Sequence, residues 1–158
     1  MALIKKDQKY KWNFDNIGGC SRVRIASGQD IAHLDELDVK MWTVLSCPVK
    51  GLEIEEKSLK YMDRDADGKI RVNDVISVAK WMTGALKNPD LLLEGKDSVL
   101  LSEINEENEV GLKLAKAAKQ ILANLGKESD CISLADTADS ADATAATRII
   151  LWLITFMF

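Results

Sequence analysis

The sequence predicts a mainly α-helical protein that contains a helix-loop-helix unit, additional helices and a small two-stranded ribbon. Apolar residues recur at helical spacing in several segments, and one loop between two such segments carries four aspartates. Residues 22–25 alternate basic and β-branched side chains, which indicates a short strand. With 158 residues, 47% of them hydrophobic, the chain is long enough to bury a core as one domain.

The N-terminal third is expected to hold the strand and the first helix. The strand at 22–25 follows a glycine pair and is expected to be half-buried. Ser27 to Asp30 has the pattern of a helix-capping box. Apolar residues then recur at helical spacing up to Pro48, which indicates one long helix or two short ones.

Helices are expected on both sides of the acidic loop. Residues 53–62 form a short amphipathic segment, and residues 73–86 carry apolar side chains on one face. The strongest helical pattern covers residues 106–125 and is closed by Gly126.

The remaining elements are short. A strand is expected at 99–101, and Ser133 to Asp136 is expected to cap a last helix that reaches about Thr147. No internal repeat is evident in the sequence.

The segment 63–74, which reads DRDADGKIRVND, carries the chemistry of the chain. Carboxylates stand at loop positions 1, 3 and 5, and a glycine at position 6 permits the sharp turn that lets them surround one ion. A hard cation such as Ca²⁺ prefers oxygen ligands of this kind, and the alternative is a loop that keeps its shape by Asx-type hydrogen bonds without a metal. The predicted metal ligands are the side chains of Asp63, Asp65, Asp67 and Asp74 and the backbone carbonyl of Lys69.

Two other loop residues have expected roles. Arg71 at position 9 would leave a water to complete the coordination in that direction. Ile70 at position 8 is expected to lie in a short strand, and such a strand needs a partner.

The loop and its flanking helices resemble the EF-hand family over residues 55–86. The resemblance implies calcium binding by a non-catalytic structural or regulatory module, with a second EF-hand or a protein partner beside the loop. A longer stretch from Trp12 resembles the N-terminal part of uncharacterised bacterial EF-hand-containing proteins, in which a second loop of the type N-G-D-G follows the region equivalent to 135–147. This chain has no such loop. The prediction is one helical domain over 1–147.

One position departs from the family pattern. Asp74 stands at position 12, where an EF-hand usually has a bidentate Glu, so we expect weaker Ca²⁺ binding and easier entry of Mg²⁺. An Asp at this position also resembles the dockerin repeat, and a dockerin-like, calcium-dependent interaction module is the alternative interpretation. Residues 55–62 supply an entering helix that a dockerin lacks.

Composition argues against other functions. A net charge of -4 provides no basic footprint for nucleic acid or an anionic membrane surface. His33, the single histidine, cannot form a histidine metal cluster alone and is expected on the polar, surface side of its helix, which argues against a catalytic triad, so no enzyme is predicted. Three widely spaced cysteines form neither a disulfide framework nor a zinc motif, and the start lacks a secretory signal, which indicates the cytoplasm.

Two C-terminal features complete the predictions. Asp136, Asp139 and Asp142 are expected to form a solvated helix face. Residues 148–158 form an apolar tail, IILWLITFMF after Arg148, which is interpreted as a truncated or frame-shifted end; the alternative is a tail that docks into the core.

Overall fold

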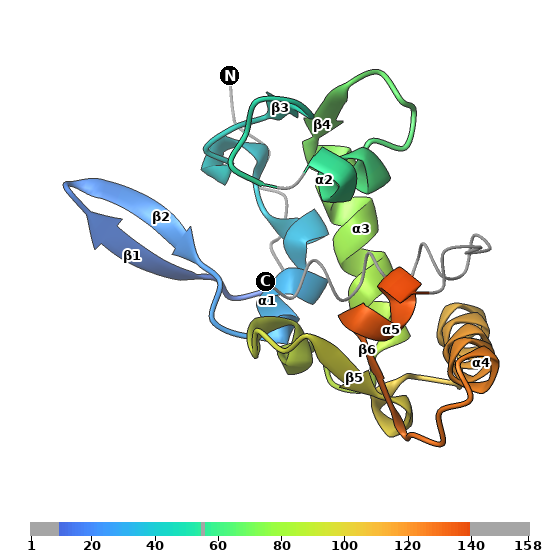
Figure 1. Ribbon diagram of the computed structural model, residues 1–158. Coiled ribbons are helices and arrows are strands. Elements are labelled where there is room, and N and C mark those ends of the chain that lie inside the picture. Colours follow the sequence, from blue (N-terminus) through green and yellow to red (C-terminus); the bar gives the residue numbers. More distant parts are fainter. Residues whose placement is uncertain (1–9, 55, 140–158) are drawn as a thin grey trace.

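A computed structural model describes residues 10–54 and 56–139 of the chain (Figure 1). The strands are β1 (Asn13–Ile17), β2 (Cys20–Arg24), β3 (Ser46–Pro48), β4 (Lys69–Arg71), β5 (Ser98–Leu100) and β6 (Cys131–Ser133). The α-helices are α1 (Gly28–Ala32), α2 (Glu56–Met62), α3 (Val72–Ala85), α4 (Glu109–Asn124) and α5 (Leu134–Asp139). Short 3-10 segments are η1 (Leu34–Glu36), η2 (Val39–Met41), η3 (Pro89–Leu93) and η4 (Leu101–Glu103).

The prediction of a mainly α protein with one ribbon is wrong, because the described residues mix helices with three two-stranded antiparallel sheets. The pairs are β1 with β2, β3 with β4, and β5 with β6. The last two sheets have strands of three residues each. Alternation of apolar and polar side chains is not detectable over so short a strand, and the partners lie far apart in the sequence.

The helix expected between residues 27 and 47 is also much shorter than predicted. Only α1 is α-helical there, and it is followed by the 3-10 segments η1 and η2 before Pro48, which lies in β3. The carboxylate of Asp38 accepts a hydrogen bond from the amide of Lys40 at 2.9 Å, so a new turn starts at this point. Asp commonly competes with helix continuation in this way. The end of the last predicted helix and the tail 148–158 lie outside the described residues.

The β1–β2 hairpin projects from the rest of the molecule (Figure 1). Its turn residues Gly18 and Gly19 have φ of 59° and 83°, which is the region that a tight hairpin turn requires. The strand predicted at 22–25 is therefore present, but it is largely exposed rather than half-buried: all of β1 and most of β2 face solvent.

The core is built around α3, which packs against α1, α2, α4 and β4. Buried side chains from distant parts of the described chain meet there. Members of this cluster are Leu59, Met62, Ile70, Val78, Met82, Ala85, Leu86, Ile104, Leu114, Ala118, Ile121 and Ile132. Because Ile70 belongs to the acidic segment 63–74, that segment is fixed to the core at this residue.

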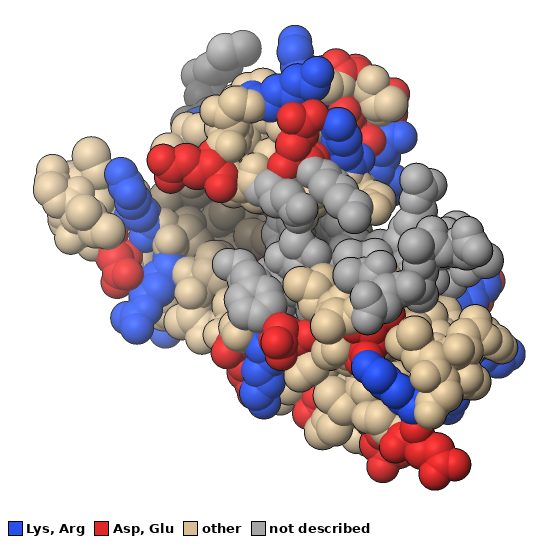
Figure 2. Space-filling view, viewed as in Figure 1, with Lys and Arg blue, Asp and Glu red and all other residues tan. Residues whose placement is uncertain are grey.

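The surface carries acidic and basic side chains interspersed, with no large field of one sign on the face shown in Figure 2. Within the described part of the chain, no helix is long and apolar enough to cross a bilayer.

Replacing Ile70, which is only 3% exposed, tests how firmly the core holds the loop. Ile70→Ala is expected to lower the free energy of unfolding by about 2 to 5 kcal/mol, as other large-to-small core changes do. Val39→Ala is the control, because Val39 is 58% exposed, and it should change stability by less than about 0.5 kcal/mol. Urea unfolding of the three proteins measures both effects, and equal midpoints would contradict the burial of Ile70.

Candidate metal centre

The acidic loop 63–74 begins directly after α2, and its second half contains β4 and the start of α3. The pairing of β4 fixes that half. Ile70 in β4 pairs with Cys47 in β3, and the amide of Val49 donates to the carbonyl of Gly68 at 3.0 Å. The expectation that the strand at position 8 finds a partner is therefore confirmed. The partner is an upstream segment of the same chain.

The turn at the centre of the loop depends on its first aspartate. The carboxylate of Asp63 accepts hydrogen bonds from the amides of Asp67 at 3.1 Å and Gly68 at 2.8 Å. Gly68 has φ of 78°, in the left-handed region that favours glycine, and Ala66 has φ of 55°. These bonds curl the backbone around the side chain of Asp63.

Three of the predicted ligands meet at this turn. One carboxylate oxygen from each of Asp63, Asp65 and Asp67 lies within 4.8 Å of the others. Asp63 is partly buried and the other two are exposed. Like charges at this separation repel one another, and a cation placed among them would relieve the repulsion. Carboxylate oxygens are also the ligands that Ca²⁺ and Mg²⁺ prefer, so this group fits a hard divalent ion.

The other two predicted ligands are placed differently. Asp74 is outside the group of three, and its Oδ2 accepts a hydrogen bond from the amide of Arg71 at 2.8 Å. This bond caps the N-terminus of α3, where a carboxylate is favourable. Lys69 lies in β4 opposite Pro48, so the pairing of that strand holds its backbone.

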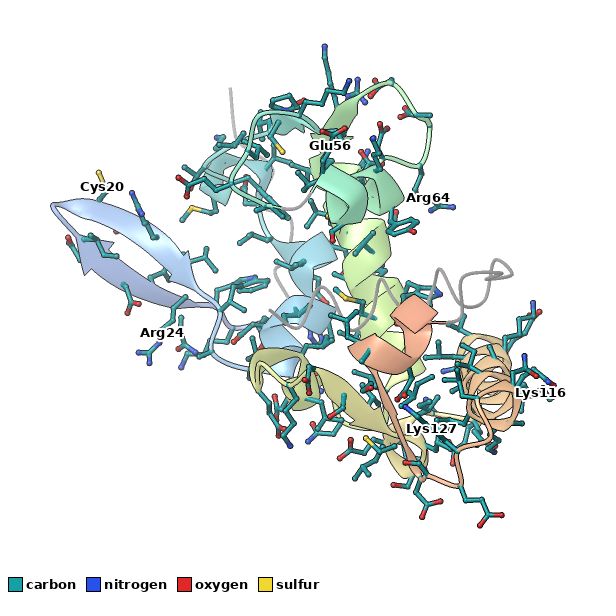
Figure 3. All side chains as sticks on the ribbon, viewed as in Figure 1. Cys20, Arg24, Glu56, Arg64, Lys116 and Lys127 are labelled. Atoms are coloured by element: carbon teal, nitrogen blue, oxygen red, sulfur yellow. The ribbon has the colours of Figure 1, made fainter. Side chains whose placement is uncertain are left out.

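Arg71 has a role that the sequence did not reveal. Its guanidinium pairs with the carboxylate of Asp67 and lies 3.7 Å from Asp65. The hydrogen bond from Arg71 lowers the pKa of the Asp67 carboxyl, and the same pair raises the pKa of Arg71. The guanidinium is thus an internal counter-ion for two of the loop carboxylates. Arg64, also in the loop, extends away from it (Figure 3).

No protein-family model, curated protein or solved structure matches this chain. The assignment of the loop therefore depends on the geometry and chemistry of its own residues.

Arg71 and a metal ion would compete for the same carboxylates. Arg71→Gln is therefore expected to strengthen Ca²⁺ binding by about two- to fivefold, the range that an exposed ion pair contributes. The control is Lys113→Gln, which removes the same charge from the exposed pair of Lys113 with Glu109 on α4. Calorimetric titration with Ca²⁺ measures both variants. Weaker binding by Arg71→Gln would show that the guanidinium supports the ion rather than competing with it.

Proposed function

We propose that this chain is a non-catalytic calcium-binding protein whose loop 63–74 holds one ion in the manner of an EF-hand. The observation that carries the proposal is the convergence of the Asp63, Asp65 and Asp67 carboxylates within 4.8 Å at the Gly68 turn. Neither the charge distribution nor the single histidine favours a catalytic centre in the described residues.

The proposed ligands are the three converging carboxylates, the backbone carbonyl of Lys69 and the carboxylate of Asp74. Asp74 uses Oδ2 to cap α3, so Oδ1 is the atom we assign to the ion, directly or through a water. A single oxygen from this position gives fewer protein ligands than a bidentate Glu. Mg²⁺ prefers fewer protein ligands and keeps its waters, so it should bind the same loop.

We infer a structural role for the ion. The loop joins α2 to β4, and α2 and α3 pack against each other, so a bound cation would fix the angle between them and neutralise the carboxylates. An EF-hand loop usually pairs its strand with the strand of a second loop, but here β4 pairs with β3. A second EF-hand is not needed for this pairing. No specific contact favours the dockerin-like alternative, since α2 enters the loop as it does in an EF-hand.

Terbium luminescence tests the location of the site. Tyr61 precedes the loop by two residues and Trp81 follows it on α3, so excitation of either should sensitise bound Tb³⁺. We expect emission in the native protein, displacement by Ca²⁺, and loss of emission in Asp63→Ala with Asp67→Ala. Glu107→Ala with Asp130→Ala removes the same charge from two exposed residues outside the loop and should leave emission unchanged. Equal loss of Tb³⁺ emission in both double variants would show that the ion binds outside the loop.

Selectivity tests the role of position 12. Asp74→Glu lengthens the side chain by one methylene, so it should restore bidentate coordination and raise the ratio of Ca²⁺ to Mg²⁺ affinity. Glu is also favoured at the third position of a helix, so the cap of α3 should persist. Asp97→Glu, at an exposed residue, is the control. An unchanged ratio in calorimetric titrations would mean that position 12 does not reach the ion.

A further inference from the structure

Residues 98–139 repeat the architecture of residues 46–85. The first unit (46–85) runs β3, α2, loop, β4, α3, and the second unit (98–139) runs β5, η4, α4, loop, β6, α5, so the strands and α-helices follow in the same order and only η4 is additional. In both units the first strand pairs antiparallel with the second, across the helix and the loop. The connections from helix to second strand, 63–68 and 125–130, are equal in length.

The hydrogen-bond register of the two strand pairs is the same. The paired residues are Ser46 with Arg71, Cys47 with Ile70 and Pro48 with Lys69 in the first unit, and Ser98 with Ser133, Val99 with Ile132 and Leu100 with Cys131 in the second. One more bond follows each pair. The amide of Val49 donates to Gly68 at 3.0 Å, and the amide of Leu101 donates to Asp130 at 2.8 Å.

The anchoring residues also correspond. Ile132, which is 1% exposed, occupies the place of Ile70, which is 3% exposed, and both belong to the same core. The amide of Ser133 donates to Oδ2 of Asp136 at 2.9 Å, as the amide of Arg71 donates to Oδ2 of Asp74 at 2.8 Å. Asp136 is therefore the counterpart of Asp74, four residues after the buried isoleucine in each unit.

The remaining metal positions are not conserved between the units. Aligned on the two isoleucines, the counterparts of Asp63, Asp65 and Asp67 are Leu125, Lys127 and Ser129. At the position of the proposed ligand Asp65, the second unit thus has the cationic side chain of Lys127. The ammonium of Lys127 forms an ion pair with Oδ1 of Asp136, whose side chain is only 7% exposed. In Figure 3 the side chain of Lys127 lies beside β6 and the start of α5.

We propose that the second unit is a metal-independent counterpart of the first, in which the ammonium of Lys127 takes the place of the ion and holds the acidic residue at position 12. The buried carboxylate of Asp136 would otherwise have no cation in its loop, and burying a charge without one is costly. The comparison with an ion rests on the proposed function, whereas the pairing of Lys127 with Asp136 and its test do not depend on metal binding in the loop 63–74.

The charge state of Asp136 agrees with this role. Hydrogen bonds from Lys127 and from the hydroxyl of Ser133 lower the pKa of Asp136 to about 2, although burial opposes the shift. The carboxylate therefore stays ionised far below neutral pH. The prediction that Asp136 belongs to a solvated helix face is wrong for this residue, which is buried and paired.

Amide hydrogen exchange in the presence of chelator tests the proposal on the whole chain. The reporters are the amides of Leu101 and Leu134, which bond across the second unit to Asp130 and Asp97. We expect both to be protected without Ca²⁺. Lys127→Met should speed their exchange by about ten- to a hundredfold, the factor that a hydrogen bond to a charged group contributes. Lys127→Arg keeps a cation and should retain most of the protection.

The control is Lys116→Met on the exposed part of α4, which should leave both amides unchanged (Figure 3). Unprotected reporters in the native protein, or equal exchange in native protein and Lys127→Met, would overturn the proposal. If Lys127→Met does not fold, an NMR titration of Asp136 in the native chain decides: a carboxyl pKa of about 2 supports the pairing, and one near 3.8 overturns it. Because every measurement is made in chelator, absence of Ca²⁺ binding at 63–74 would leave these results unchanged.

Discussion

The mutual repulsion of the Asp63, Asp65 and Asp67 carboxylates is the constraint on which the account of this protein depends. The backbone brings them within 4.8 Å by curling around Asp63, and a cation nearby would lower their repulsion. Arg71 supplies part of that charge from within the loop. A divalent ion would supply more, and would bind all three carboxylates at once, which one guanidinium does not.

The β3–β4 pair makes this convergence possible. It buries Ile70 in the core and fixes the end of the loop. The packing of Ile70 therefore helps to position the carboxylates that precede it in the sequence. The second unit has the same strand register and the same capping acid, but Lys127 stands where the first unit has Asp65. In both loops a basic side chain lies beside the acidic residues. In the second loop Lys127 is that side chain, and in the first Arg71 is, but the first loop also has three carboxylates that suit a metal ion.

Local chemistry was predictable from the sequence, and long-range pairing was not. The capping box at Ser27, the α4 helix and the three clustered aspartates all follow from spacings within a few residues. Strands are predicted at or near β2, β4 and β5, but β3 and β6 are not predicted, because they lie far from their partners in the sequence. The pairing of Arg71 and that of Asp136 are not visible in the sequence, although their partners lie only four and nine residues away: the loop places the guanidinium of Arg71 beside the carboxylates, and Lys127 pairs with an acid that composition alone assigns to the surface.

Equilibrium dialysis of the whole chain against radioactive Ca²⁺ tests the central claim most directly, because it counts bound ions without relying on a conformational signal. The account predicts saturation at one ion per chain, abolished by Asp63→Asn with Asp65→Asn and Asp67→Asn and unaffected by Lys127→Arg. Absence of saturable binding at millimolar Ca²⁺, or binding that persists in the triple variant, would contradict it.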